Sequence, residues 1–571
     1  DTRVLSTEAF LKKTRATLAL AAILLSIVAA NAQEQTEIPK LVETVDVRVI
    51  NVDVVVTDRK GNPINGLQMD DFEVYENRRP QKVTNFYEVR ATEAPTPVEP
   101  AAAAPAPAAP RVETEEIPPH LRRRVIFYVD NLSMAPFNRN RVFQQMKVFA
   151  KDALRPGDEA MIVTWNRSMK IRVPFTNDAK LIEQQLDAIA GESALGIQTI
   201  SERRSLESRI RDTNNYNEAI AIARQYSQSV EHDLRQSVSA INGLISMFAG
   251  LEGKKILVLT TEGFPIQPGR EMFMFIEEMR REKQEWQAST SGSLESLSFE
   301  SSRLIESIAR GANANGITMY TLHAGGLAGG SEMSAENSQP IPYSVTQAAL
   351  QNSTDSLHLM AEMTGGLAIV GTNNFKDGFK KIGRDLQSYY SLGYRSGTER
   401  VDRQRQVEVR VKNRNYVVRS RRSFVEKSVP TEMSDRVIAN LFYPTSTNDL
   451  KITVTTGLPV RQEDGNFQIP VDVHIPMESL TFLPQGEMML GGFSVFVAAA
   501  NKAGDMSDVS RRSQQVRLKP DEMPTIKGKH YTYQLELLVE KGPNKISVGV
   551  IDEIANLTGF DRREVLAADL R

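Results

Sequence analysis

Two acidic residues follow apolar segments at positions where carboxylates can do chemistry. Asp130 ends the run VIFYVD (125–130), and Glu262 follows the run ILVLTT (256–261). In a parallel sheet, sites form where loops leave the carboxyl ends of the strands, so these side chains are expected at one rim. Asp130 is interpreted either as a ligand of a hard cation, which prefers oxygen, or as an acceptor for the N–H groups that begin the next helix.

Other candidate sites are weaker. Asp70 and Asp71 are paired carboxylates that could bind calcium, but a turn before a strand explains them equally well. The glycine-rich stretch 325–330 lacks the Lys and Ser/Thr that follow a phosphate-binding loop. Trp165 and Trp286 are isolated, which argues against a stacking platform for nucleic acid.

The composition excludes several classes of function. The chain has no cysteine, so thiol catalysis, disulfides and thiolate zinc sites are ruled out, and its six histidines form no ligand pair. Its 69 basic and 71 acidic residues leave almost no net field to attract nucleic acid or an anionic membrane. No nucleophile–base pair or carboxylate pair of glycosidase type stands out, so the sequence predicts a protein that is not an enzyme.

The N-terminal residues 1–32 have the pattern of a secretory signal peptide. Basic residues precede an apolar run from Leu18 to Ala30, which ends in the small-x-small pattern Ala30-Asn31-Ala32. The apolar run is shorter than the roughly 20 residues that a membrane-spanning helix needs. An exported protein is expected, in the periplasm, on the cell surface or in the medium, with no transmembrane segment after cleavage of the signal.

With 571 residues, the chain is too long for one core, and roughly three or four domains are expected. Residues 33–90 contain alternating apolar and polar runs separated by turn residues, which predicts a small β domain. Residues 91–119 are rich in Ala and Pro and predict an extended linker.

Short apolar runs alternate with helical patterns over residues 120–398. This alternation is typical of an α/β, doubly wound and mostly parallel sheet with helices on both faces. The charged stretches 200–232 and 267–310 predict surface helices inserted between the core elements.

The remainder of the chain is predicted to be β-structure. Residues 399–429 contain two alternating strands around an Asn-rich turn, which predicts an appended β hairpin. Residues 430–571 contain several short alternating strands with Gly, Pro or Asn turns, which predicts a C-terminal β-sandwich.

Several motifs together resemble a known family. They are VIFYVDNLS, KKILVLTTEGFP, GITMYTLHAGG and the closing YYSLGYRS with VEVRVKNRNYVVRSRRSF, preceded by INVDVVVTDRKGNPINGLQMDDFEVYENRRPQKVTNF. In this order, over roughly residues 45–425, they are similar to the von Willebrand factor A-related (VWFA-related) proteins of the acidobacterial type. The resemblance implies a von Willebrand factor A-like fold for residues 120–398.

The resemblance also implies a metal-ion-dependent adhesion site (MIDAS) for Mg²⁺ or another divalent cation. In that family, an Asp-x-Ser-x-Ser loop, a threonine from a second loop and a Thr-Asp-Gly-like loop supply the ligands. Here Leu132 and Met134 stand at the two serine positions, so the motif is degenerate. The metal ligands that the resemblance implies are Asp130, Ser133, Thr199 and Glu262.

Together these observations predict an exported multidomain binding protein. It is expected to work in adhesion by recognising a protein or cell-surface ligand, without nucleic acid and without turnover. One alternative is a structural scaffold of an envelope complex, which large apolar patches on the terminal sandwich, with a filled metal position, would favour. The other is an extracytoplasmic hydrolase whose catalytic groups meet only in the folded chain.

Overall fold

A computed structural model describes residues 49–90, 122–283, 286, 292–327, 341–397, 400–445 and 447–569. The predicted signal peptide 1–32 and the predicted linker 91–119 lie outside the described residues. Among the helices of the described residues, none combines the length and apolar character required to cross a bilayer.

The central domain is built on a six-stranded sheet in the order β10-β9-β8-β5-β6-β7. Its strands are β5 (Arg123–Asp130), β6 (Glu159–Trp165), β7 (Met169–Thr176), β8 (Lys254–Thr261), β9 (Ile317–His323) and β10 (Ala368–Ile369). All neighbouring pairs are parallel except β6 and the edge strand β7. The predicted, mostly parallel sheet is therefore present.

Helices cover both faces of this sheet because alternate residues of each buried strand point to opposite sides. Phe127 packs with α2 (Pro136–Asp152), α3 (Ala179–Ala190) and α10 (Phe375–Gln387). Its neighbour Tyr128 packs on the other face. That face is covered by α5 (Tyr216–Met247), α8 (Ser302–Ala314) and α9 (Tyr343–Thr364).

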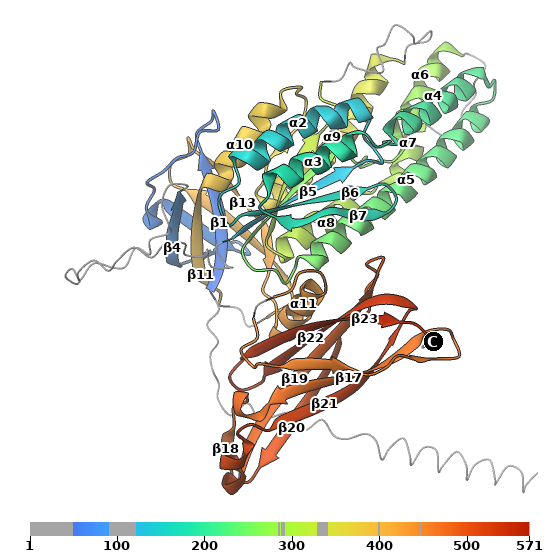
Figure 1. The fold of residues 1–571 in the computed structure, drawn as a ribbon. Coiled ribbons are helices and arrows are strands. Elements are labelled where there is room, and N and C mark those ends of the chain that lie inside the picture. Colours follow the sequence, from blue (N-terminus) through green and yellow to red (C-terminus); the bar gives the residue numbers. More distant parts are fainter. Residues whose placement is uncertain are drawn as a thin grey trace, which may run out of the picture.

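The charged stretches form a helical extension with a core of its own. It contains α4 (Gly196–Asp212), the first half of α5, α6 (Arg270–Glu282) and α7 (Gly292–Ser296). Trp286, 5% exposed, packs in this core with Tyr216 and Phe275. Figure 1 shows the extension projecting from one end of the central sheet. These helices are therefore more than solvated surface segments.

The segments that precede and follow the central domain in the sequence together form one N-terminal β-sandwich. One sheet has the order β13-β1-β11-β4 and the other β14-β12-β2-β3, and their inward side chains share one core. The strands are β1 (Val49–Thr57), β2 (Phe72–Glu76), β3 (Arg79–Gln81), β4 (Val83–Arg90), β11 (Ser388–Arg395), β12 (Gln404–Val411), β13 (Val417–Ser420) and β14 (Ser423–Val425).

This sandwich corrects the domain limits expected from the sequence. The units 33–90 and 399–429 are not separate, because β2 pairs with β12 over Phe72–Glu76. Residues 388–395, assigned to the unit 120–398, form β11 between β1 and β4. The central α/β domain is thus inserted into the sandwich between β4 and β11. Helix α10 ends at Gln387 and β11 begins at Ser388, so no loop residue separates the two units.

The C-terminal unit begins with a helix that the sequence analysis missed. Helix α11 (Val429–Phe442) buries Val437 and Leu441 against Phe496 and Phe560. It lies between the central domain and the C-terminal sandwich (Figure 1). The segment 430–571 was predicted as β-structure throughout, and this prediction is wrong for its first residues, which form α11.

The C-terminal β-sandwich has two sheets with a common core. The first contains β15 (Thr453–Thr456), β16 (Val460–Arg461), β17 (Phe467–Pro476) and β21 (His530–Val539). The second contains β18 (Leu483–Gln485), β19 (Met488–Asn501), β20 (Ser510–Leu518), β22 (Gly542–Asp552) and β23 (Thr558–Ala567). Short 3-10 turns lie at Met69–Asp71, Leu297–Phe299, Met477–Ser479 and Pro520–Ile526.

Candidate functional site

Asp130 lies at the carboxyl rim of the central sheet, at the end of β5 and beside the end of β8. The register pairs Val129 with Thr260, which brings Thr261 next to Asp130. The Asp130 carboxylate is 1% exposed. Its Oδ2 accepts hydrogen bonds from Ser133 Oγ at 2.7 Å and Thr261 Oγ1 at 2.8 Å. Its Oδ1 accepts from the N–H groups of Leu132 at 3.1 Å and Ser133 at 3.3 Å.

We call Asp130, Ser133 and Thr261 the rim cluster. The two hydroxyl oxygens lie 2.9 Å apart, so the three side-chain oxygens form a compact triangle. The backbone N–H of Glu262 donates to Ser133 Oγ at 3.1 Å, and that of Gly263 donates to Thr261 Oγ1 at 3.1 Å. The cluster therefore ties the loop after β5 to the loop after β8 through contacts within the chain.

The Glu262 side chain reaches the start of α2. Its Oε1 accepts hydrogen bonds from the backbone N–H of Ala135 at 2.8 Å and from Asn138 Nδ2 at 2.9 Å. Ala135 is the N-cap residue of α2 and offers no side-chain acceptor, so Glu262 satisfies a donor at this helix end. The helix-start acceptor is therefore Glu262 and not Asp130, because the N–H groups that Asp130 accepts belong to Leu132 and Ser133, in the loop before α2.

Burial raises the pKa of both carboxyl groups. Loss of solvation raises the pKa of Asp130, and the hydrogen bonds from Ser133 and Thr261 oppose this rise. Loss of solvation also raises the pKa of Glu262, against the hydrogen bonds from Asn138 and Ala135. The charge of Asp130 adds to the rise for Glu262, since two like charges disfavour each other.

Two further side chains at the rim were missed by the sequence analysis. Arg141 of α2 donates through Nη2 to the carbonyl of Ala324 at 2.9 Å, and its guanidinium lies 5.3 Å from the Phe375 ring centroid. His323, at the end of β9, is 5% exposed, and burial lowers its pKa. The rule that selected Asp130 and Glu262, a polar residue at the end of a buried strand, also selects His323.

Thr199 does not join the rim cluster. It lies in the first turn of α4, and its hydroxyl donates to the carbonyl of Leu195 at 3.3 Å. The start of α4 nevertheless packs against the Asp130 loop, where the N–H of Leu195 donates to the carbonyl of Asn131 at 2.9 Å. A Cβ on Gly196 would lie 2.4 Å from the carbonyl carbon of Met134, so this approach requires glycine.

The two residues at the expected serine positions serve the hydrophobic cores. Leu132 is 9% exposed and packs on the face covered by α5, whereas Met134 is fully buried on the face covered by α2. A serine at either position would place a hydroxyl among apolar side chains. Apolar side chains at these two positions therefore anchor the loop in the two hydrophobic cores.

The predicted donor set does not fit a divalent cation. Asp130, Ser133 and Glu262 meet at the rim, but hydrogen-bond donors of the chain occupy both Asp130 oxygens and Glu262 Oε1, and Thr199 bonds within its own helix. A hard cation requires about six oxygen ligands that it can contact directly. Among the residues that the structure describes, no group of three or more His, Asp or Glu side chains is arranged to hold a metal ion.

A groove of about 220 Å³ lies beside the rim, between α4 and α5. Leu132 connects it to the Asp130 loop, and Thr199 lines it. Its other apolar lining residues are Leu195, Leu206, Ile222 and Val230. Charged and amide side chains, including Arg167, Gln198, Glu202 and Asp233, complete the wall.

Three large apolar side chains are exposed next to the rim. Phe137 is 75% exposed in the first turn of α2, Ile197 is 57% exposed at the start of α4, and Leu327 is 58% exposed after β9. The N–H of Leu327 donates to Asn373 Oδ1 at 3.2 Å, and Arg141 lies 5.7 Å from the Phe137 ring centroid. We call Phe137, Ile197 and Leu327 the apolar rim residues.

Comparisons with known proteins give structural likenesses alone. No protein-family model and no curated protein matches the chain. The vWF domain of the type V pili tip protein Mfa5 from Porphyromonas gingivalis is 10% identical, with 47% of this chain and 95% of that one covered and a TM-score of 0.23. BatB from Bacteroides thetaiotaomicron is 10% identical over 47% and 97% of the chains, with a TM-score of 0.22. A mutant of the PilB minor pilin from Streptococcus sanguinis is 12% identical over 59% and 79%, with a TM-score of 0.26.

Proposed function

We propose that this chain is an exported binding protein of the VWFA-related type, and that the carboxyl rim of its α/β domain recognises a protein partner in adhesion. The observation that carries the proposal is the set of three exposed apolar rim residues around the end of the sheet where ligands bind in this class of fold. Exposed large apolar side chains that gather at one place are typical of a protein–protein contact.

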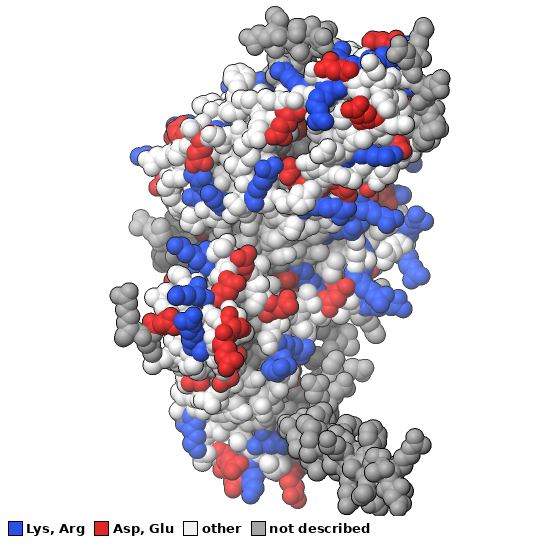
Figure 2. Space-filling view, turned by 90° about the vertical axis from the view of Figure 1, so that its right-hand side faces the viewer, with Lys and Arg blue, Asp and Glu red and all other residues white. Residues whose placement is uncertain are grey.

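The groove beside the rim supports the same proposal. It offers apolar side chains for a partner's anchor residue and polar groups that fix its orientation, as binding clefts commonly do. Basic and acidic side chains are interspersed over much of the face drawn in Figure 2, which favours a mixed protein surface as the partner over nucleic acid.

Binding without turnover fits the surroundings of the rim hydroxyls. Ser133 Oγ contacts Asp130, Thr261 and the N–H of Glu262, and the described contacts give it no histidine base. A serine nucleophile needs a base within hydrogen-bond reach. In this proposal the rim cluster holds the loops that present the contact surface, and it acts without a cation.

The test compares two triple variants of the full chain. The rim variant is Phe137→Ser, Ile197→Ser, Leu327→Ser, and the matched control is Leu458→Ser, Leu538→Ser, Leu566→Ser, whose leucines are 67%, 59% and 64% exposed on the C-terminal sandwich. Binding of labelled protein to intact cells of the source organism is measured before and after protease treatment of the cells. We expect saturable binding of the wild type, and we expect protease treatment of the cells to abolish it. The rim variant should not bind, whereas the control variant should bind as the wild type does. Equal binding by the two variants would refute the rim as the contact surface.

A further inference from the structure

A cavity of about 440 Å³ lies where the N-terminal sandwich, the central domain and α11 meet. The N-terminal sandwich contributes residues from β1 and from the segment around β14, the central domain contributes the ends of α5 and α8, and α11 closes the remaining side. Its polar lining residues are Asn51, Asn315, Arg421, Glu426, Lys427, Glu432, Asp435 and Arg436. Cavities of this size at domain interfaces commonly hold small molecules.

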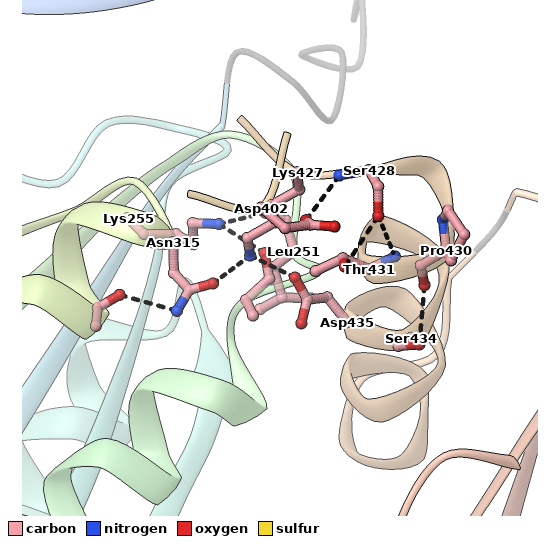
Figure 3. Close-up of polar contacts among 12 residues, drawn as sticks. Leu251, Lys255, Asn315, Asp402, Lys427, Ser428, Pro430, Thr431, Ser434 and Asp435 are labelled. Atoms are coloured by element: carbon pink, nitrogen blue, oxygen red, sulfur yellow. Dashed lines mark hydrogen bonds and ion pairs between the residues drawn. The ribbon is translucent and has the colours of Figure 1, made fainter. Parts of the chain in front are cut away.

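Two carboxylates in the lining are already paired with cations. Asp435 forms an ion pair with Lys427, whose ammonium group also donates to Asn315, as Figure 3 shows. Glu426 forms an ion pair with Arg405 at 2.7 Å. These pairs neutralise part of the lining. A third carboxylate of the lining, Glu432, acts on Arg436 through its charge, so the lining has three acidic and three basic side chains.

Arg421 has no carboxylate within ion-pair distance among the described residues. Its Nη2 donates to the carbonyl of Asn51 at 2.5 Å, and its Nε is buried without a hydrogen-bond partner. Burial lowers the pKa of this guanidinium, and the charge of Asp53, beyond ion-pair distance, acts in the opposite direction. Arg421 is half-buried, and an arginine with a buried, unused Nε donor beside a cavity is an incomplete anion-binding group.

Arg436 of α11 also has no carboxylate within ion-pair distance among the described residues. Its Nη1 donates to Thr558 Oγ1 at 3.3 Å, and its guanidinium lies 4.4 Å from the Phe560 ring centroid. Burial lowers its pKa, while the charges of Glu252, Glu432 and Asp449 act in the opposite direction from beyond ion-pair distance. The guanidinium thus retains donor capacity beside the cavity.

Lys255 lies behind the cavity. It is 7% exposed, and its ammonium group donates to the carbonyls of Leu251 at 2.9 Å and Ala249 at 3.2 Å. Figure 3 shows it beside Lys427. Among the described residues no carboxylate forms an ion pair with Lys255, and burial lowers its pKa to about 7. Above that pH Lys255 adds little positive charge to the junction, so the two arginines are the cations left to hold an anion.

We propose that this cavity binds a small anion that carries carboxylate or phosphate groups, held between Arg421 of the N-terminal sandwich and Arg436 of α11. Such an anion accepts hydrogen bonds from two guanidinium groups that belong to different structural units. Its binding stabilises the present arrangement of the sandwich and α11. The site is separate from the rim and does not depend on the function proposed for the rim.

Calorimetric titration of the full chain tests this site. The probes are inorganic phosphate and malonate, each at constant ionic strength set with sodium chloride, and they distinguish a phosphate from a carboxylate ligand. The variants are Arg421→Gln and Arg436→Gln, and Arg512→Gln, at an exposed position of β20, is the control. Because charge-assisted hydrogen bonds are strong, each junction variant is expected to bind the anion at least about tenfold more weakly.

The outcomes separate the site from general charge effects. Saturable heat with either probe in the wild type and the control, weakened in both junction variants, supports the proposal. The rim variant is expected to bind the anion as the wild type does. The proposal is overturned if neither probe gives saturable heat at about 10 mM, a concentration far above the Kd of ordinary binding sites. It is also overturned if both junction variants bind like the wild type while their circular dichroism shows that they are folded.

Discussion

Arg419 of β13 and Asp385 of α10 form a two-point ion pair, with Nη1 at 2.8 Å from Oδ2 and Nη2 at 2.7 Å from Oδ1. Tyr320 of β9 also donates to Asp385 Oδ2, at 3.1 Å. The pair joins the N-terminal sandwich to the central domain at the place where α10 continues directly into β11. Three elements of two units therefore depend on one buried carboxylate.

Breaking this pair is expected to weaken the fold strongly. Asp385→Asn leaves Arg419 without its counter-charge in a buried place, and removing one partner of such a pair costs about 3–5 kcal/mol. The control is Glu362→Gln, whose partner Arg422 lies 3.2 Å away, because both side chains are more than 60% exposed. An exposed pair contributes about 0–1 kcal/mol. Urea unfolding followed by fluorescence measures both, and equal midpoints for the two variants would contradict the prediction.

The rim cluster is expected to stabilise the fold through Asp130. Asp130→Asn replaces one of the two acceptor oxygens by an NH2 group. Either the hydroxyls of Ser133 and Thr261 or the N–H groups of the loop then lose their acceptor. Loss of hydrogen bonds to a buried charged group costs about 1.5–3 kcal/mol. Thr199→Val is the control, since the exposed Thr199 lies outside the cluster and should change stability by about 0.5 kcal/mol or less. Thermal unfolding of both variants compares them, and a larger loss for Thr199→Val would reverse the interpretation.

Titration of the full chain with Mg²⁺, Ca²⁺ and Mn²⁺ tests the cation that the sequence resemblance implies. We expect no saturable heat, because internal hydrogen bonds occupy the Asp130 oxygens and Glu262 Oε1. Saturable heat in the wild type that is absent from Asp130→Asn would show that a cation displaces these hydrogen bonds.

Lys255 is expected to make stability depend on pH in the alkaline range. Burial, followed by the charge of Lys427, lowers the pKa of Lys255 from 10.5 to about 7. Between these two values the unfolded chain holds a proton that the folded chain has released, so the free energy of unfolding rises as pH increases. The slope for one such group is at most about 1.4 kcal/mol per pH unit.

Lys255→Met removes this dependence while keeping a long apolar side chain. Unfolding midpoints from pH 7 to 10 are measured for both proteins, and their difference isolates Lys255 from the other titrating groups. The prediction is that the wild type gains stability relative to the variant as pH rises. A difference that stays constant with pH would mean that Lys255 is charged in the folded protein.

Two glycines in helices are expected to respond in opposite directions to alanine. A Cβ on Gly196, at the start of α4, would lie 2.4–2.6 Å from backbone atoms of Met134 and Ala135, so Gly196→Ala should cost about 1–3 kcal/mol. A Cβ on Gly243, within α5, meets nothing within 4 Å. Gly243→Ala should therefore stabilise by up to about 1 kcal/mol through helix propensity. Denaturant unfolding measures the stability of both variants. If Gly196→Ala leaves the free energy of unfolding unchanged, the close approach of α4 to the Asp130 loop is refuted.

The sequence by itself determined the secondary structure of the central domain and the position of its carboxyl rim. Runs such as 123–130 and 254–261 are buried on both faces, and this burial appears in the sequence as unbroken apolar residues. The same reasoning placed Asp130 and Glu262 at the rim, because the end of a strand can be read from its local pattern.

Only the tertiary structure decided which distant segments belong together. Val49 of β1 and Arg395 of β11 pair within one sheet of the N-terminal sandwich, although the whole central domain lies between them in the chain. Strand periodicity reports which face of a strand is buried, but it does not identify the partner strand. The same limit applies to α11 and to the core around Trp286. Their roles follow from contacts between elements far apart in sequence, which no local pattern records.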